Sequence, residues 1–388
     1  MPKSNYLLIT PDYPPPFVGG SKVWLYGLLE NCPDNFDVLT SSLREGCQEV
    51  AGPNQTMLRK PWITDSDNPT TKQLLINYLM MPLWLFWRTR RVKYKLVIVN
   101  HGVIGVGLVI LMARFLNIRI LGTALTEEIT LSLYGKGLKN IIRRWFFFNC
   151  YKKATAFIAV CHFCKRLIVE HVNFPEELIT VIPSGITPEK TTSSARKKEA
   201  GHTIISVGRL VERKGFHFLL DAVARLKPDI PNIKVHVVGN GPMLPRLQTQ
   251  IQQLNLEDCV ELHGLTSDDT LAALYSESDL FVLAHTMLEN GDTEGCPTVF
   301  SEAGSMGLPL IGGINAGSDT AINEGENGFI VDTKDVSILA EKIRLLLLNP
   351  RLAQEMGKAA QKKVERDHNP SINGKRLGLF LTHISETK

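Results

Sequence analysis

The stretch LFVLAHTMLENGDTEGCPTVFSEAGSMGLPLIG, residues 280–312, contains the clearest structural pattern in the sequence. Its first five residues form an uninterrupted apolar run, which is typical of a buried strand. Pro297 suits the first turn of a helix, apolar residues follow it at helical spacing, and Gly307 and Pro309 end that pattern. A second apolar run follows at once. The stretch therefore predicts strand, loop, helix and strand, the repeating unit of a parallel α/β sheet.

Two carboxylates flank the start of this predicted helix. Glu294 falls in the loop and Glu302 lies about one turn inside the helix, so their side chains are about 80° apart around its axis and do not share a face. The helix start between them offers unpaired backbone N–H groups and positive dipole density, which suit a phosphate. The stretch therefore indicates half of a nucleotide site.

The same alternation of strand and helix patterns extends along the chain, whose 388 residues exceed the usual size of one core. A polar, aperiodic linker at 187–202 separates two series. We predict two doubly wound, Rossmann-like α/β domains, 1–190 and 191–365, and a helical C-terminal segment, 366–388, that returns to the first domain. The candidate strands are 5–10, 36–40, 95–100, 119–124, 156–160, 203–208, 235–239, 260–264, 280–284, 309–312 and 328–331.

Composition narrows the class of protein. Hydrophobic residues make up 44% and charged residues 21% of the chain, and the net charge is +4, which is too weakly basic to indicate nucleic acid and is compatible with an anionic substrate or membrane surface. Seven scattered cysteines fit a reducing cytosol. Cys161 and Cys164 form a C-x-x-C without a second pair at zinc-site spacing, so we expect them to pack in the structure. The N-terminal apolar run is too short for a signal peptide, which predicts a soluble or peripheral protein.

Residues just after the strands are candidates for ligand contacts, because open α/β sheets bind ligands there. Gly19 and Gly20 follow the first strand and would bring backbone amides close to an anion or sugar, or else form a plain tight turn. Arg209 and Lys214 follow the strand at 203–208 and would offset a diphosphate without a metal; the alternative is a solvated basic loop.

Other nucleotide-binding classes are disfavoured. Gly239 and Gly241 begin a dinucleotide fingerprint, but Leu244 stands where the third glycine belongs. The chain also lacks a Walker A sequence. These departures argue against a Rossmann dehydrogenase and a P-loop NTPase.

Five motifs together resemble the retaining glycosyltransferases of family 4, which have the GT-B fold. That resemblance covers nearly the whole chain, and its R-x4-K and E-x7-E spacings are specific. It implies transfer of a sugar from a nucleotide diphosphate sugar to an acceptor hydroxyl, in a cleft between an acceptor-binding first domain and a donor-binding second domain. The motifs are PPPFVGG (14–20), VGRLVERKG (207–215), GNGP (239–242), HGL (263–265) and EGCPTVFSE (294–302).

The resemblance also implies roles for single residues. Arg209 and Lys214 hold the diphosphate, aided by backbone amides near Thr298 and Val299. Glu302 accepts hydrogen bonds from the ribose hydroxyls. In this family, retention is explained by front-face attack, with the leaving phosphate assisting deprotonation of the acceptor.

Two further roles complete the implied site. Glu294 faces the donor sugar, and Gly19 and Gly20 line the phosphates. Cleaving a sugar–phosphate bond develops positive charge on the sugar and negative charge on the diphosphate, so a carboxylate beside the sugar and cations beside the phosphates suit the chemistry. The alternative for Glu294 is a loop carboxylate that caps a backbone amide.

No metal or other cofactor is expected. The chain contains one D-x-D sequence, Asp65-Ser66-Asp67, in a polar stretch that predicts a surface loop and not a strand end. The cations Arg209 and Lys214 and the helix start near Thr298 already supply positive potential to a diphosphate.

The chain departs from the family at several positions. The family's His-Gly near the donor sugar is replaced by Leu125 and Thr126, its usual Ser by Cys161 and its usual Asp by Thr187. His101 follows the preceding strand and is a second catalytic candidate, with a structural histidine as the alternative. An altered sugar preference or an inactive relative would explain these departures.

Two basic, aromatic segments, 78–95 and 136–153, concern the acceptor. The sequence favours core helices with solvated basic ends. The alternative is contact with an anionic bilayer, by a cytoplasmic protein at the inner face, with a lipid-linked saccharide or glycolipid of polysaccharide biosynthesis as acceptor. Two other functions stay open: a GT-B-fold sugar-nucleotide epimerase, and a non-catalytic sugar-nucleotide-binding partner.

Overall fold

The structure of the chain is a computed structural model that describes residues 5–11, 13–14, 20–43, 47–63, 70–100, 103–186 and 202–386. The chain divides into two compact units, one of residues 1–185, 289–291 and 370–388, the other of residues 186–288 and 292–369. The domain boundaries at 190 and 365 stay predictions. Several features singled out in the sequence lie outside the described residues: Gly19 and most of the PPPFVGG motif, His101, Asp65-Ser66-Asp67, and the linker from Thr187 up to residue 201.

The first unit is built on a seven-stranded parallel sheet in the order β3-β2-β1-β4-β5-β6-β7. The five predicted strands are confirmed, whereas β3 and β7 were missed. Both are edge strands with several half-exposed residues, so neither carries a long apolar run. The strands are β1 (Tyr6–Ile9), β2 (Phe36–Ser41), β3 (Gln55–Lys60), β4 (Leu96–Val99), β5 (Ile120–Ala124), β6 (Ala156–Ala159) and β7 (Ile179–Val181).

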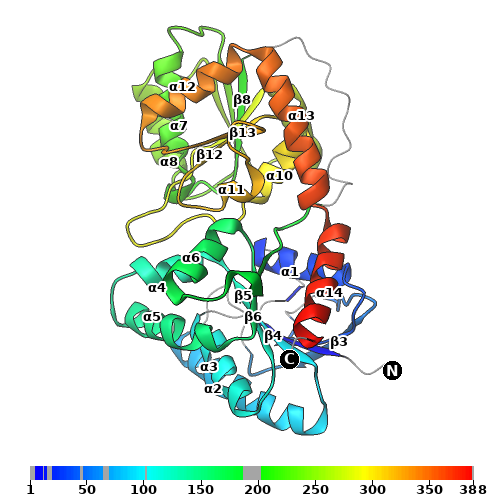
Figure 1. Cartoon of the computed structure of the whole chain (residues 1–388). Coiled ribbons are helices and arrows are strands. Elements are labelled where there is room, and N and C mark those ends of the chain that lie inside the picture. The colour runs from blue at the N-terminus through cyan, green and yellow to red at the C-terminus, as the bar shows by residue number, and fades with distance from the viewer. Residues whose placement is uncertain are drawn as a thin grey trace. The chain divides into compact units, whose positions relative to one another are not determined.

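Seven α-helices accompany the strands of the first unit in the part of the chain that the structure describes. The last of them, α14, packs against α1, so the C-terminal end of the chain belongs to this unit (Figure 1). The helices are α1 (Gly20–Glu30), α2 (Thr71–Arg91), α3 (Val103–Phe115), α4 (Thr126–Tyr134), α5 (Leu138–Cys150), α6 (His162–Val172) and α14 (Pro370–Glu386).

The second unit contains a six-stranded parallel sheet in the order β10-β9-β8-β11-β12-β13. All six predicted strands are confirmed. Strands β8, β11 and β12 are fully buried and read as continuous apolar runs, whereas most residues of the edge strand β10 are half-exposed. The chain order reverses between β8 and β11, the switch point where doubly wound sheets bind ligands. The strands are β8 (Thr203–Val207), β9 (Lys234–Val238), β10 (Val260–Gly264), β11 (Leu280–Leu283), β12 (Leu310–Gly313) and β13 (Gly328–Val331).

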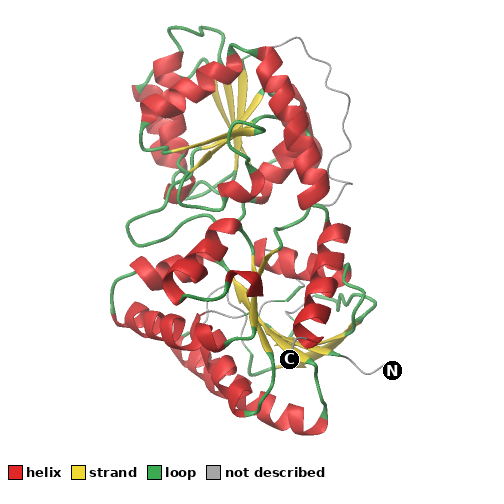
Figure 2. Ribbon diagram, in the orientation of Figure 1, coloured by secondary structure: helices red, strands yellow, loops and turns green. Residues whose placement is uncertain are grey.

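Helices lie on both sides of this sheet, with separate apolar clusters beneath them (Figure 2). One cluster packs α7, α8 and α12 against the strands, and the other packs α9, α10 and α13. The predicted doubly wound α/β architecture of both domains is confirmed. The helices are α7 (Phe216–Leu226), α8 (Leu244–Gln253), α9 (Asp268–Glu277), α10 (Thr298–Ser305), α11 (Ser318–Ala321), α12 (Val336–Leu347) and α13 (Pro350–Asp367).

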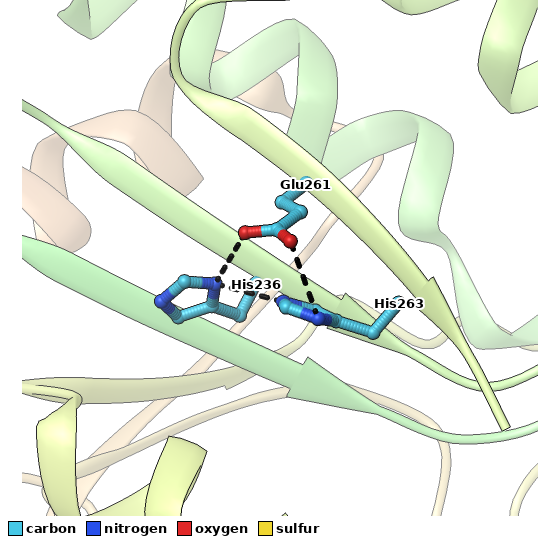
Figure 3. Close-up of side chains that lie close together, drawn as sticks. All are labelled: His236, Glu261 and His263. Carbon is cyan, nitrogen blue, oxygen red and sulfur yellow. Dashed lines mark hydrogen bonds and ion pairs between the residues drawn. The ribbon is translucent and has the colours of Figure 1, made fainter. Parts of the chain in front are cut away.

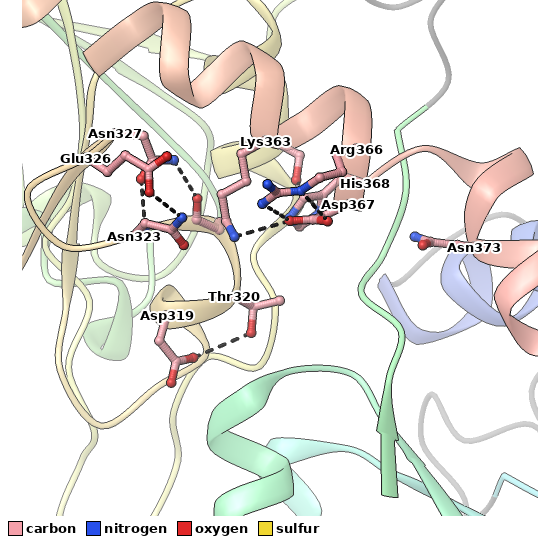
Figure 4. A network of polar contacts seen from close by, with 12 residues as sticks. Asp319, Thr320, Asn323, Glu326, Asn327, Lys363, Arg366, Asp367, His368 and Asn373 are labelled. Carbon is pink, nitrogen blue, oxygen red and sulfur yellow. Dashed lines mark hydrogen bonds and ion pairs between the residues drawn. The ribbon is translucent and has the colours of Figure 1, made fainter. Parts of the chain in front are cut away.

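The helix predicted after Pro297 is α10, and the end of α13 holds it in place. The Ser301 hydroxyl and Nδ1 of buried His368 are 2.9 Å apart. Close by, Asp367 pairs with Lys363 at 3.3 Å and with Arg366 at 2.9 Å, which anchors the last turn of α13 (Figure 4). The contact between Ser301 and His368 connects α13 to the helix that carries Glu302.

Two helices of the first unit, α2 and α5, each expose an apolar stripe. Both helices flank α3, which buries their inner sides. The expectation of core helices is therefore wrong for their outer sides, because each helix is apolar on two faces and α3 covers one. We call these outer side chains the apolar face: Leu75, Leu79, Leu83 and Trp87 of α2, which are 57%, 58%, 51% and 61% exposed, and Leu138, Ile141 and Trp145 of α5, which are 73%, 61% and 55% exposed.

No helix within the described ranges combines the length and apolarity needed to cross a bilayer.

Candidate active site

The predicted site residues Lys214 and Glu294 meet where β8 and β11 end. Lys214 lies in the short 3-10 helix Glu212–Lys214 after β8, and Glu294 lies in the loop between β11 and α10. Lys214 Nζ donates a hydrogen bond of 2.9 Å to Glu294 Oε2. Both side chains are almost fully buried, so their charges interact in a medium of low dielectric constant.

Glu294 has a second cationic neighbour that the sequence analysis missed. Arg213 Nε lies 3.0 Å from Glu294 Oε1 and 3.3 Å from Asp292 Oδ1. The contact between Arg213 and Glu294 is an ion pair without hydrogen-bond geometry. The adjacent Arg-Lys pair in the sequence was the available signal.

The ionised form of Glu294 is stabilised despite burial. Burial raises the pKa of this carboxyl, but the charges of Lys214 and Arg213 outweigh that effect and hold the pKa below its ordinary value. Glu294 is therefore a carboxylate at neutral pH, able to accept hydrogen bonds or to stabilise positive charge, and it is not a proton donor.

Gly215 explains how Lys214 reaches β11. Its backbone has a φ of +67°, and a Cβ at this position would lie 1.8 Å from the carbonyl oxygen of Ala284 at the end of β11. Only glycine permits this conformation and this approach. Because Gly215 follows Lys214, the backbone at Lys214 can lie directly beside β11.

Arg209 is an exposed residue in the loop after β8. It is close enough to Asp292 to act on its ionisation: burial raises the pKa of Asp292, and the charges of Arg213 and Arg209 counteract that rise. The structure therefore brings Arg209 into the same charged neighbourhood as Lys214 and Glu294.

The predicted phosphate site falls at the start of α10. The helix begins at Thr298, with Pro297 as its N-cap, and no side chain caps this terminus. Thr298 and Val299 are half-buried. Their backbone amides are positioned at the positive end of the helix dipole.

Glu302 has a protein partner that the sequence did not predict. Its Oε2 accepts a hydrogen bond of 3.2 Å from the hydroxyl of Tyr275, a buried residue of α9. Burial, and then the charge of Glu302, raise the pKa of Tyr275 well above its ordinary value, so the tyrosine stays a donor. This contact orients the half-buried carboxylate of Glu302.

Residues of the first unit are only partly placed. Gly20 begins α1, and Leu125 is the N-cap of α4 without a side-chain bond. Cys161 caps α6 by accepting from the Cys164 amide, and its Sγ lies 3.2 Å from the hydroxyl of Thr126. The expected packing of Cys161 and Cys164 is confirmed, since both are fully buried.

His285 is a buried residue of the site that the sequence analysis missed, although it directly follows β11. Its Nδ1 lies 3.0 Å from the Leu283 carbonyl oxygen, and its Nε2 lies 2.8 Å from the Ser318 hydroxyl. Burial lowers the pKa of His285 to about 4; the nearby carboxylate of Glu294 opposes the shift and Lys214 adds to it. A neutral imidazole therefore borders the Lys214–Glu294 pair.

His285 should make the protein sensitive to acid. Because its pKa falls from 6.5 to about 4 on folding, the unfolded chain binds one more proton between those values, and stability declines as the pH decreases through that window. The expected loss between pH 7 and pH 4.5 is about 2 kcal/mol. Urea unfolding at pH 7 and at pH 4.5 measures this loss of stability. The variant His285→Asn should show a smaller decline than the parent. The control variant His171→Asn, at an exposed position, should show the same decline as the parent. Equal pH slopes in the parent and His285→Asn would contradict this assignment.

Two doubly wound α/β units, with a lysine and two glutamates after the strands of the second, match the architecture of the GT-B fold. Residues 189–363 match the family described as Glycosyl transferases group 1, and residues 18–190 match Glycosyltransferase Family 4. The chain belongs to this group 1, family 4 set of GT-B glycosyltransferases.

Two curated proteins are similar to this chain in sequence. WcaL of Escherichia coli (strain K12), named for colanic acid biosynthesis, is 31% identical over 218 residues, which are 55% of this chain and 53% of WcaL. The GDP-mannose-dependent alpha-(1-6)-phosphatidylinositol monomannoside mannosyltransferase of Mycolicibacterium smegmatis is 29% identical over 187 residues, 48% of this chain and 49% of that protein. The chain spans about half the length of the curated relatives it matches.

A solved structure shows the same fold. Alr3699/HepE of Anabaena, in complex with UDP, superposes with a TM-score of 0.71 at 17% identity, over 98% of this chain and 100% of that one. At this identity the likeness concerns architecture alone.

Proposed function

We propose that this protein is a retaining, metal-independent glycosyltransferase that moves a sugar from a nucleotide diphosphate sugar to a saccharide or glycolipid acceptor at an anionic membrane, in polysaccharide biosynthesis. The observation that carries the proposal is the buried Lys214–Glu294 pair at the switch point of the second sheet. The names of the two relatives support the pathway class, since one is assigned to colanic acid and the other to a mannosylated lipid.

The charges of this site suit the cleavage of a sugar–phosphate bond. Lys214 and Arg209, with the amides at the start of α10, stabilise the negative charge that develops on the leaving diphosphate. The carboxylate of Glu294 stabilises the positive charge that develops on the sugar. Lys214 Nζ donates a hydrogen bond to Glu294. In the proposed complex its ammonium group would therefore lie between the carboxylate beside the sugar and the leaving diphosphate.

An assay with a panel of nucleotide sugars tests the activity. Incubation with and without a membrane extract should give nucleotide release that depends on the acceptor. Isomerised nucleotide sugar without acceptor would identify the epimerase instead, and binding without turnover would identify a non-catalytic partner. The anomeric configuration of the product, determined by NMR, tests retention.

A thermal-shift screen of UDP, GDP and ADP determines which nucleotide base the donor contains. The mannosyltransferase relative is named for GDP-mannose, and the Anabaena structure contains UDP. A nucleotide at about 100 times its dissociation constant adds about 2.7 kcal/mol of stability, which a melting curve resolves.

Glu302→Ala should weaken donor binding more than it weakens the fold. The proposed ligand partners of Glu302 are ribose hydroxyls, and losing charged hydrogen bonds of this kind costs about 1.5–3 kcal/mol, or about 10–150-fold in affinity. Titration calorimetry with the nucleotide measures this loss. Tyr275→Phe is the control, because it removes the protein partner of Glu302 and keeps the carboxylate. A folded Glu302→Ala variant with parental affinity would remove Glu302 from the site.

Transfer should survive EDTA. The cations Lys214 and Arg209 and the α10 terminus supply the positive potential at the proposed diphosphate position, so the chemistry needs no divalent ion there. Initial rates are compared before and after treatment with EDTA, and after addition of Mg²⁺ or Mn²⁺. Abolition by EDTA with recovery on adding either ion would contradict this account.

The apolar face on α2 and α5 supports an acceptor held at a membrane. Exposed apolar side chains of this number on one unit are a feature of protein or membrane contacts. Neither helix contains an aspartate or glutamate. Exposed cations accompany the apolar residues: Arg90 and Arg91 at the end of α2, Lys93 just after it, and Lys139, Arg144, Lys152 and Lys153 in and after α5.

The two helices lie near each other in the first unit. Arg143 of α5 acts electrostatically on Tyr78 of α2: burial raises the pKa of Tyr78, and the charge of Arg143 lowers it. Apolar side chains rimmed by cations match a bilayer with anionic headgroups, which attracts basic residues and accepts Trp and Leu at its interface. The proposed location is therefore peripheral, at the cytoplasmic face.

A further inference from the structure

Two histidines and a glutamate meet on one face of the second sheet, outside the site described above. His236 lies on β9, and Glu261 and His263 lie on the edge strand β10. His236 and Glu261 are direct cross-strand partners. Figure 3 shows the three side chains directed toward one another from the two strands.

A β-bulge brings His263 into this cluster. Leu262 pairs with Val237 and Gly264 pairs with Val238, so His263 is an extra residue in β10. Gly264 has a φ of +67°, a conformation that glycine adopts readily. Bulges of this kind re-aim a side chain, and here the bulge directs an imidazole toward its neighbour on β9.

The distances suit a shared cation. His236 Nδ1 and His263 Nε2 are 3.0 Å apart, and the carboxylate of Glu261 lies 3.8 Å from His236 Nδ1 and 3.6 Å from His263 Nδ1. One ligand atom from each residue lies within 4.8 Å of the other two. Ligands at about 2.0–2.1 Å from a tetrahedral ion are about 3.3 Å from one another, so small movements of the side-chain tips complete the geometry.

The two histidines of this cluster are held by the surrounding structure, whereas the glutamate can change its side-chain conformation. Each histidine side chain is 14% exposed, whereas that of Glu261 is 66% exposed. The strand partner of His236 on the other side is Ile205, a core residue, so the sheet face would accept an aliphatic side chain here. Two imidazoles in this place cost desolvation energy, which a bound cation would offset.

We propose that His236, Glu261 and His263 bind a divalent transition metal ion, zinc being the ion that two imidazoles and one carboxylate favour. Water completes the coordination on the open side. The ion ties the edge strand β10 to β9 and has a structural role. The cluster shares no residue with the proposed diphosphate site, so the inference does not rest on the proposed function.

Co²⁺ is the spectroscopic probe, and Zn²⁺ its competitor. The whole chain, treated with EDTA and then dialysed free of it, is titrated with Co²⁺ in a background in which Cys47 and Cys296, the two cysteines that are not buried, are serine. The expected result is visible ligand-field absorption that saturates at one ion per chain and is displaced by Zn²⁺. Zinc should also raise the melting temperature.

Variants assign the site. His236→Gln and His263→Gln should each weaken binding more than about 100-fold, since losing even an outer partner of a metal ligand costs 10–100-fold. Glu261→Gln removes an exposed carboxylate and serves where a histidine variant fails to fold. His217→Gln, a half-buried histidine of α7, is the matched control and should bind as the parent. The proposal is overturned if the parent binds no Co²⁺, or if the cluster variants bind it with parental affinity and stoichiometry.

Discussion

Lys214→Ala is expected to lower turnover by about 10²–10³-fold, the effect of losing one donor aimed at developing charge. The ammonium group is buried beside Glu294, so its field on the leaving diphosphate is screened little by water. The rate of nucleotide release at saturating donor and acceptor measures the effect. Lys214→Arg, which keeps the charge, should retain more activity than Lys214→Ala.

A folding control belongs with this experiment, because the substitution leaves the buried carboxylate of Glu294 with Arg213 alone. Removing one partner of a buried pair destabilises a protein by about 3–5 kcal/mol. The double variant Lys214→Met, Glu294→Gln removes both charges and should recover stability without recovering turnover. Lys227→Ala, which breaks an exposed pair with Asp258, is the matched control. Near-parental turnover in a folded Lys214→Ala enzyme would refute the proposed stabilisation of the leaving group.

The triple variant Leu79→Ser, Leu83→Ser, Trp87→Ser should lose about 10³-fold in affinity for anionic vesicles. Each of these exposed side chains contributes about 1.5 kcal/mol when it enters a bilayer interface, which sums to about 4.5 kcal/mol. Sedimentation with vesicles of phosphatidylglycerol and phosphatidylcholine measures the partition. In the parent, high salt should weaken binding, because the basic rim contributes through screened charge.

Leu265→Ser is the control for this experiment. Leu265 is 80% exposed, as prominent as any side chain of the apolar face, but belongs to the second unit. It should not change sedimentation. Parental sedimentation of the triple variant, or equal binding of the parent at low and high salt, would argue against the proposed membrane contact.

Most strands of both sheets and the motifs of the site could be predicted from the sequence alone. Central parallel strands are apolar throughout, because helices cover both faces, so runs such as 280–284 identify them without further information. Strands β3 and β7 lack that signal, because most of their residues are half-exposed and neither contains a long apolar run. The start of α10 could also be predicted, because it depends on Pro297 and on the helical spacing of the apolar residues that follow it.

Which charges meet depends on how the strands are arranged in space. Lys214 and Glu294 are 80 residues apart, and their pairing exists because β8 and β11 are neighbours at the switch point. The roles of Arg213, His285 and Tyr275 depend on the same assembly, as does the cluster at His236. The apolar face also depends on packing. Helix α2 is apolar on two sides, and its sequence does not indicate which side is buried. Its contact with α3 buries one side and leaves the other exposed.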